Sequence, residues 1–370
     1  MTPDATTQDI EFVPDRTLSL ETGRIAKQAD GSVVVRLGDT MVLSTATLSD
    51  SVQNNNFFPL TVDYREKFAA GGKVPGGFIK REGRPTDKET LTARLIDRAI
   101  RPLFPDGFYH DVHIVNFVIS AGKDFDADVI AGVGSSAALM FSGAPFQGPI
   151  AEVRVGRVDG EYIVNPTMEQ TAQSDMDLVV AGKEDALVMV EGEADEISEE
   201  DMIEGLDTAH RSIRRLCKGQ KRLVEKHGEP DDFEWEADVV PEDLVDKLQA
   251  KYGSRVADHI RGEYSKESFY AGIDAVKDNA ADDLLGDDDE TPEGYTRSDI
   301  NDAVESVQKN EMRKMVVEEG RRLDGRSQED VRDLWMEVGY LPRVHGSAIF
   351  TRGETQVLGS ITLGTSEDVQ

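Results

Sequence analysis

Two stretches of the chain match each other without a gap at a constant offset of 315 residues. Residues 31–48 and 346–363 are identical at eight of eighteen positions, including the glycine and threonine of a central Gly-acid-Thr turn. The β-branched runs that flank this turn predict a strand hairpin in each copy. Hairpins resemble one another in general, but a gapless match that keeps both glycines favours duplication of a whole domain.

The duplication predicts an α+β chain in three parts. Residues 10–229 mix strand and helix patterns without strict alternation, as expected for mixed sheets with packed helices. Residues 236–315 carry helix-length patterns with almost no strand signal, which predicts an all-α linker domain. Residues 321–370 are expected to hold only the opening strands of a second, truncated copy, because about 50 residues cannot close a domain of the first copy's size.

Composition excludes several classes of protein. No run of eighteen apolar residues occurs and the N-terminus is polar, so neither a membrane span nor a secretory signal is expected, and a cytoplasmic location is predicted. The single cysteine, Cys217, rules out an internal disulfide. The six histidines show no metal-binding spacing, which disfavours a histidine-metal enzyme.

The average charge argues against nucleic acid as a partner, but its distribution does not. The chain has 72 acidic and 41 basic side chains and a formal net charge of −31, as a protein from a salt-rich cytoplasm would have. Residues 73–101 nevertheless hold eight basic and four acidic residues. Phosphate binding requires such a local positive field.

Within this basic segment, a glycine-rich loop precedes a helix. The helix is expected over residues 87–104, with a capping box at its start. At 100° per residue, Arg94, Arg98 and Arg101 share one face of it. The predicted RNA contacts are Phe78, Lys80, Arg81, Arg84, Arg94, Arg98 and Arg101, because an exposed aromatic ring stacks on a base while cations hold phosphates. A structural ion-pair network on the same residues is the open alternative.

Two weaker sites are considered elsewhere in the first copy. Residues 132–136 would place backbone amides and the hydroxyls of Ser135 and Ser136 around an anion if a helix began there. The small residues would equally allow tight helix packing. Asp177, with Asp175 two residues earlier, is a weak candidate for a magnesium ligand, since two carboxylates alone are poor support for a metal site.

Four motifs together resemble bacterial polynucleotide phosphorylase. They are residues 58–64 (FPLTVDY), 76–85 (GGFIKREGRP), 94–105 (RLIDRAIRPLFP) and 341–356 (LPRVHGSAIFTRGETQ). The resemblance covers essentially the whole chain and implies two RNase PH-like cores joined by a helical domain. It implies a ring-shaped homotrimer that degrades RNA from the 3′ end with inorganic phosphate, releases nucleoside diphosphates, runs in reverse as a polymerase, and is assisted by Mg²⁺.

The resemblance also implies roles for particular residues. The loop at residues 77–81, with Arg84 and the helix arginines, would line a central channel for single-stranded RNA. Many relatives have Phe-Phe-Arg-Arg where this chain has Phe78, Ile79, Lys80 and Arg81. Ser135, Ser136 and Asp177 stand near the places of the phosphate-binding serines and a metal-organising aspartate, while Val179 replaces a lysine. This implies a degenerate first core.

The catalytic residues and most of the Mg²⁺ ligands are therefore expected beyond Gln370, and the 370-residue chain alone is expected to be inactive. Its expected partners are single-stranded RNA, further copies of itself and other RNA-decay enzymes, with no membrane. The alternative is a naturally short, non-catalytic RNA-binding or scaffold protein.

Overall fold

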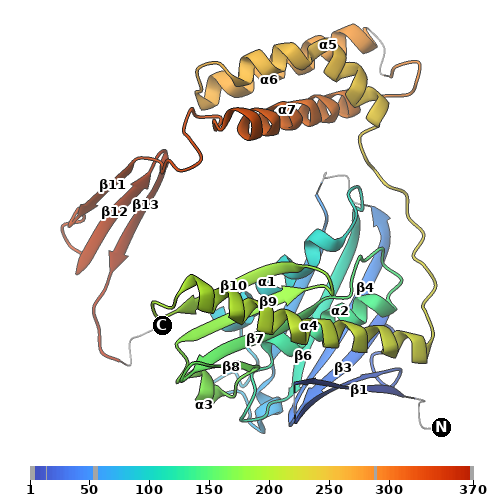
Figure 1. The fold of residues 1–370 in the computed structure, drawn as a ribbon, viewed down its shortest axis with the longest axis vertical. Coiled ribbons are helices and arrows are strands. Elements are labelled where there is room, and N and C mark those ends of the chain that lie inside the picture. The colour runs from blue at the N-terminus through green and yellow to red at the C-terminus, as the bar shows by residue number, and fades with distance from the viewer. Residues whose placement is uncertain (1–4, 14, 53–56, 287–289, 367–370) are drawn as a thin grey trace. The chain divides into compact units, whose positions relative to one another are not determined.

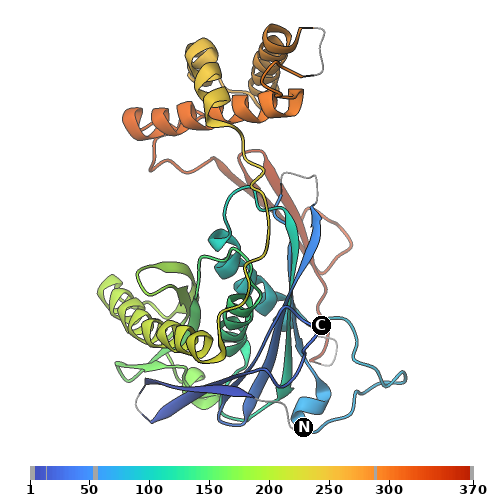
Figure 2. The ribbon, with the colours of Figure 1, turned by 90° about the vertical axis from the view of Figure 1, so that its right-hand side faces the viewer.

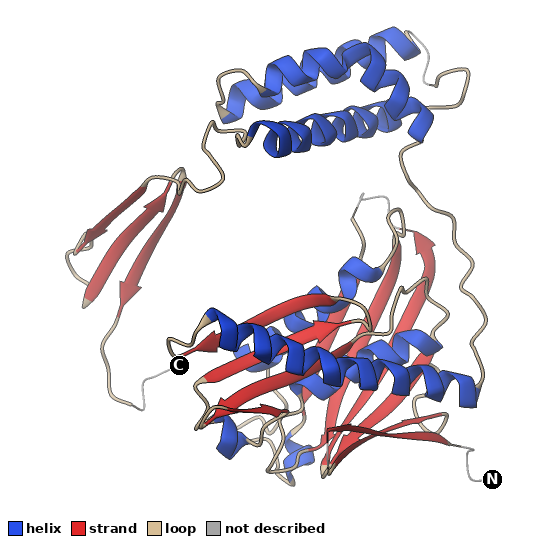
Figure 3. Cartoon of the chain, viewed as in Figure 1, coloured by secondary structure: helices blue, strands red, loops and turns tan. Residues whose placement is uncertain are grey.

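The computed structural model describes residues 5–13, 15–52, 57–286 and 290–366. The chain divides into two compact units, residues 1–239 and 240–370. Figures 1 and 3 show strands and helices interleaved along the first unit, and three helices followed by three strands in the second. No helix among the described residues is long and apolar enough to cross a membrane.

The first unit contains two sheets. Its strands are β1 (Thr6–Val13), β2 (Arg16–Thr22), β3 (Gly31–Leu37), β4 (Thr40–Val52), β5 (Leu60–Glu66), β6 (His110–Ser120), β7 (Ala151–Val158), β8 (Glu161–Val164), β9 (Met176–Gly182) and β10 (Leu187–Ala194). They form sheets of order β1-β2-β3-β4-β6-β5 and β10-β9-β7-β8. Strands β5 and β6 are parallel, whereas their neighbours pair antiparallel. The first sheet is therefore mixed and the second is antiparallel throughout, and together with the packed helices they confirm the predicted α+β class.

Helices cover these sheets. They are α1 (Asp87–Ile100), α2 (Asp128–Phe141), the short α3 (Met168–Thr171) and α4 (Glu199–His227), with two 3-10 turns, η1 (Phe68–Gly71) and η2 (Arg101–Leu103). Helix α2 packs on β3 and β4 of one sheet and on β7 of the other, so it lies between the sheets (Figure 2). Helix α4 packs on β1, β7 and β9, and α1 on β5.

Small residues in α2 allow the two sheets to approach it closely. A Cβ atom added at Gly132 would lie 2.2 Å from a carboxylate oxygen of Glu152, and one at Gly134 would lie 2.3 Å from the Ser44 hydroxyl. Because neither contact is sterically possible, glycine is required at both positions. At these two glycines the backbone of α2 therefore lies directly against side chains of the strands, and the core around α2 depends on this close approach as well as on apolar side chains.

The second unit begins with α5 (Glu242–Ile260), α6 (Lys266–Leu285) and α7 (Arg297–Glu319), which share one apolar core. The sheet β11-β12-β13 follows, formed by β11 (Leu334–Val338), β12 (Gly346–Arg352) and β13 (Thr355–Ile361). The expected helical region and the expected strands after it are both present. The exact boundaries of the three predicted domains stay a prediction.

The predicted hairpin repeat extends to the strand register. In the first copy Gly31 pairs with Ala46 and Leu37 with Thr40. In the second copy Gly346 pairs with Ile361 and Arg352 with Thr355. Each of these four residues lies 315 positions after its counterpart in the first copy. The turn glycines, Gly38 and Gly353, adopt φ values of 61° and 59°. This left-handed conformation explains why glycine occupies both turns.

Candidate nucleic-acid interface

The start of α1 is fixed to the end of β5 by one glutamate. The Thr86 hydroxyl accepts a hydrogen bond from the Glu89 amide at 3.2 Å, and the Glu89 carboxylate accepts from the Thr86 amide at 2.7 Å, which confirms the predicted capping box. The second carboxylate oxygen accepts from the Glu66 amide at 2.8 Å. Burial raises the pKa of Glu89, but these backbone hydrogen bonds outweigh burial and hold the pKa below its ordinary value.

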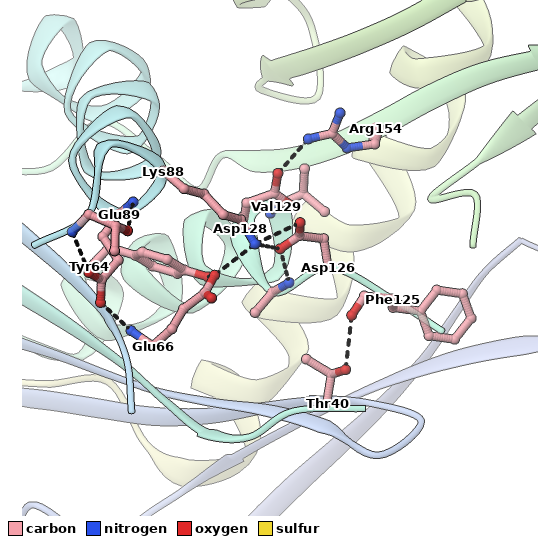
Figure 4. Close-up of polar contacts among 12 residues, drawn as sticks. Thr40, Tyr64, Glu66, Lys88, Glu89, Phe125, Asp126, Asp128, Val129 and Arg154 are labelled. Atoms are coloured by element: carbon pink, nitrogen blue, oxygen red, sulfur yellow. Dashed lines mark hydrogen bonds and ion pairs between the residues drawn. The ribbon is translucent and has the colours of Figure 1, made fainter. Parts of the chain in front are cut away.

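Lys88 joins the same region to a neighbouring loop. Its ammonium nitrogen lies 2.8 Å from a carboxylate oxygen of Glu66 and 2.9 Å from one of Asp126 (Figure 4). Burial lowers the pKa of Lys88. The hydrogen bond with Glu66 and the charge of Asp126 raise the pKa by more than burial lowers it, so the net shift is upward. Lys88 is thus a paired, structural cation.

A cavity of about 710 Å³ opens beside this cluster. Its walls come from the end of β5, the start of α1, the segment 67–86 and the segment 121–127. The charged residues that line it are Arg65, Glu66, Lys67, Lys73, Arg81, Glu82, Arg84, Lys88, Glu89 and Asp126. Six of these are basic and four are acidic, so the cavity is cationic in a chain that is strongly anionic on average.

The base of the segment 67–86 is tied down, whereas its tip projects. Arg65 donates a hydrogen bond to the Gly83 carbonyl at 3.0 Å, and the Phe68 amide donates to the Glu82 carboxylate at 3.2 Å. The Phe78 ring at the tip is fully exposed, at 102% of its reference area. A large aromatic ring left entirely in water is unusual for a folded protein and is available for stacking.

Four of the predicted RNA-contact cations have no competing partner within the described ranges. The side chains of Lys80, Arg81, Arg84 and Arg94 are exposed and form no ion pair or hydrogen bond with any residue that the structure describes. Lys80 also has a φ of 55°, a left-handed conformation that redirects the loop after the Phe78 tip. Their charges therefore remain uncompensated by local carboxylates.

The other two arginines predicted on this face, Arg98 in α1 and Arg101 at the start of η2, differ from Arg94. Arg98 forms an ion pair with Glu191 of β10 at 2.5 Å. Arg101 holds the Asp97 carboxylate at 2.6 and 3.0 Å and donates to the carbonyls of Phe58 and Leu60 at 2.8 and 3.0 Å. Arg98 and Arg101 thus bind other parts of the fold, whereas Arg94 has no ion pair or hydrogen bond with a described residue.

Ser135 and Ser136 lie inside the protein. Both are completely buried in the second half of α2, so no helix starts there to bind an anion. The Ser135 hydroxyl donates to the Asn116 side chain at 2.9 Å, and the Ser136 hydroxyl accepts from the Ile150 amide at 2.9 Å. The position corresponds to the second alternative, tight helix packing, and the possible phosphate site at these serines is not supported.

Asp177 is neutralised by an arginine. The Arg154 guanidinium lies 2.5 Å from Asp177 and 2.5 Å from Asp128. The part of the chain that the structure describes holds no group of three histidine, cysteine, aspartate or glutamate side chains that fits a metal ion. Asp128 and Asp177 therefore do not fit Mg²⁺, because the guanidinium already supplies the positive charge between these two carboxylates.

Sequence reasoning missed two cations of the cavity. Arg65 and Lys67 precede the basic segment 73–101, and Lys67 lies over the Phe117 ring at 4.7 Å. They lie between the motif at residues 58–64 and the glycine-rich loop, and this position is a sequence signal that could have included them.

Three family models match successive parts of the chain. Domain 1 of the 3′ exoribonuclease family matches residues 15–145, and domain 2 of that family matches residues 148–212. The RNA-binding domain of polyribonucleotide nucleotidyltransferase matches residues 243–327. A curated polyribonucleotide nucleotidyltransferase of Salinibacter ruber is 82% identical over 370 residues, which is all of this chain and 52% of that protein.

The chain belongs to the polyribonucleotide nucleotidyltransferase family. Members from Elusimicrobium minutum and Prosthecochloris aestuarii are 47% and 43% identical over 99% and 98% of the chain. The chain spans about half the length of the curated relatives it matches. The family assignment agrees with the resemblance inferred from the four motifs, including the RNase PH-like architecture of the first unit.

Proposed function

We propose that this chain is the RNA-guiding part of a phosphorolytic 3′-to-5′ exoribonuclease. One observation carries the proposal: the fully exposed Phe78 lies on a loop beside a cationic cavity, with three cations, Lys80, Arg81 and Arg84, that pair with no residue in the described part of the chain. The ring offers a stacking platform for a base, and the cations offer contacts to backbone phosphates. This combination suits single-stranded RNA of any sequence, since every base has a π-face.

Arg94 completes the proposed contact set, whereas Arg98 and Arg101 act in it at most as positioning residues. The guanidinium of Arg101 is committed to Asp97 and to the carbonyls of Phe58 and Leu60, so it would hold the start of β5 against the end of α1. Arg98 is held by Glu191, although its side chain remains 49% exposed.

In the proposed reaction, an oxygen of inorganic phosphate attacks the terminal phosphodiester phosphorus. The bond to the 3′ oxygen of the preceding nucleotide breaks, a nucleoside diphosphate leaves, and the shortened RNA keeps a 3′ hydroxyl. This chain would orient the strand, and the reacting groups would be held by residues beyond Gln370. The proposal includes Mg²⁺ bound there, a homotrimer around a central channel, and a cytoplasmic setting.

The test uses the full-length protein and a homopolymeric single-stranded RNA. We expect phosphate-dependent release of nucleoside diphosphates, and we expect the variant Lys80→Gln/Arg81→Gln/Arg84→Gln to raise the KM for long RNA with a smaller change in kcat, because binding is lost away from the reacting bond. RNA binding without any phosphate-dependent release would favour the alternative, a non-catalytic RNA-binding or scaffold protein.

A further inference from the structure

The second half of α4 carries a concentrated positive charge that the proposed function does not use. Residues 211–226 contain seven basic residues and one acidic residue, a net charge of +6 over sixteen positions. The basic segment around the proposed RNA loop reaches +4 over twenty-nine positions. In a chain with a net charge of −31, this helix is a second local reversal of charge.

All seven cations lie on one face of the helix. At 100° per residue, they fall within about 140° of the helix circumference. Each of them is exposed, and the opposite side packs in the core through buried residues. The exposed cations are Arg211, Arg214, Arg215, Lys218, Lys221, Arg222 and Lys226. They form a basic stripe along about 22 Å of helix, with at least one cation per turn.

The one acidic residue of this segment, Glu225, is exposed on the same face, and two carboxylates from outside the segment pair with its cations. Arg211 is paired with Glu204 at 3.1 Å and Lys221 with Glu184 at 2.7 Å. Arg214 and Arg215 donate only to backbone carbonyls, which leaves their charges uncompensated. Lys218, Arg222 and Lys226 have no ion pair or hydrogen bond with any residue in the described ranges.

The helix dipole does not account for the arrangement. Cations near a helix C-terminus are stabilised by the partial negative charge there, but the effect is confined to about the last turn. Helix α4 ends at His227, and four of the cations lie two to four turns before that end. Mutual repulsion of seven cations on one face costs stability, so a purely structural role would favour mixed charges.

The chemistry of the stripe identifies its partner. Every exposed side chain on this face is charged apart from its aliphatic stem, and none is aromatic or apolar. A protein partner needs apolar or aromatic anchors, which this face lacks. A row of cations without a stacking ring suits the phosphates of a nucleic acid, read without base contacts.

We propose that the basic stripe of α4 is a second RNA-binding surface, which holds the phosphate backbone of paired and unpaired RNA alike. This second proposal rests on the proposed function only in choosing RNA, rather than another polyphosphate, as the ligand of the stripe. In Figure 2, α4 and the projecting loop 72–86 lie on opposite sides of the first unit. The stripe would therefore bind the body of an RNA, separately from the strand that contacts Phe78.

The experiment compares three charge-matched variants of the full-length protein. The stripe variant is Lys218→Gln/Arg222→Gln/Lys226→Gln, the loop variant is Lys80→Gln/Arg81→Gln/Arg84→Gln, and the control is Arg24→Gln/Lys27→Gln/Arg36→Gln. Fluorescence anisotropy measures binding of a blunt RNA duplex and of a single-stranded oligonucleotide over a salt series. A blunt duplex offers no unpaired base to stack on Phe78, so its binding isolates the backbone contacts.

We expect the stripe variant to weaken duplex binding at least tenfold at low salt relative to the control variant. The slope of log K against log salt should fall by about 2 to 3 in magnitude, since each lost phosphate contact contributes ~0.9. The loop variant should keep most of its duplex binding, and its single-strand binding should weaken to the level that the intact stripe supplies.

Each outcome separates the two proposals. Equal duplex binding by the stripe and control variants overturns the stripe proposal, even if the loop variant fails to bind single strands. Loss of duplex binding in the stripe variant together with normal single-strand binding in the loop variant supports the stripe and contradicts the proposed function. Tighter binding of poly-glutamate than of the duplex to the unchanged protein also overturns the stripe proposal.

Discussion

The guanidinium of Arg154 lies 2.5 Å from the carboxylate of Asp177, the aspartate that the sequence offers as a metal ligand. The same guanidinium lies 2.5 Å from Asp128, which is buried in α2. Burial raises the pKa of Asp128, and the charge of Arg154 opposes that shift. An internal cation thus occupies the position between two carboxylates of the first unit, and it ties β7 to both β9 and α2.

We expect Arg154→Gln to destabilise the first unit by about 3–5 kcal/mol, because the buried Asp128 loses its counter-charge. Hydrogen exchange of the α2 amides in the full-length protein measures this as a loss of protection. The double variant Arg154→Met/Asp128→Asn removes both charges and should recover much of the loss. A change below about 1 kcal/mol in the single variant would show that Asp128 is compensated in another way.

A second prediction concerns pH and the buried Glu152. Burial, followed by the nearby charge of Asp128, raises the pKa of Glu152 to about 8. One of its carboxyl oxygens has no hydrogen-bond partner among the described residues. The folded state therefore holds a proton that the unfolded state releases above a pKa of about 4.5, so this contribution to stability is full below that value and is lost as the pH rises through about 8.

We expect Glu152→Gln to remove this dependence. Relative to the unchanged protein, the variant should gain stability as the pH rises from 5 to 8, by up to about 1.4 kcal/mol per pH unit. Hydrogen-exchange protection of the α2 and β7 amides, measured for both proteins at each pH, gives the difference in stability between them. The intrinsic exchange rates cancel because the two proteins are compared at the same pH. A difference that stays flat over this range would contradict a neutral buried Glu152.

Local features of the fold were predictable, whereas contacts between distant segments were not. The hairpin repeat and the Thr86–Glu89 capping box depend on residues close in sequence, and the structure has both. The pairing of Arg98 with Glu191, ninety-three positions away, depends on the packing of α1 near β10. The burial of Ser135 likewise follows from the position of α2 between two sheets. The basic stripe of α4, in contrast, is visible in a simple count of charges along the sequence.

A third prediction separates Arg101 from Arg94. Arg101→Gln removes an ion pair and hydrogen bonds to the carbonyls of Phe58 and Leu60, so we expect a loss of about 2–3 kcal/mol in stability. Arg94→Gln removes no ion pair or hydrogen bond with a described residue and should change stability by less than about 0.5 kcal/mol. Thermal unfolding of the full-length variants gives both values.

RNA binding should show the reverse order for these two arginines. Arg94→Gln should reduce the salt slope for single-stranded RNA by about 0.7, the value for one lost phosphate contact. Arg101→Gln should leave that slope unchanged at a temperature where the variant is folded. A slope change for Arg101→Gln equal to that for Arg94→Gln would place Arg101 in contact with the strand.

The last prediction concerns the stacking ring at the tip of the loop. Phe78→Ala should weaken binding of single-stranded RNA by about 1–3 kcal/mol, the usual value for one base stacked on an aromatic side chain. The stability of the protein should not change, because the ring is fully exposed and buries no surface. Phe78→Trp should retain binding, and Ile79→Phe, which adds a second exposed ring, should strengthen it. Anisotropy titrations at one fixed salt concentration measure all three variants, since none of them alters a charge. Equal affinity of Phe78→Ala and the unchanged protein would mean that the loop holds RNA through its cations alone.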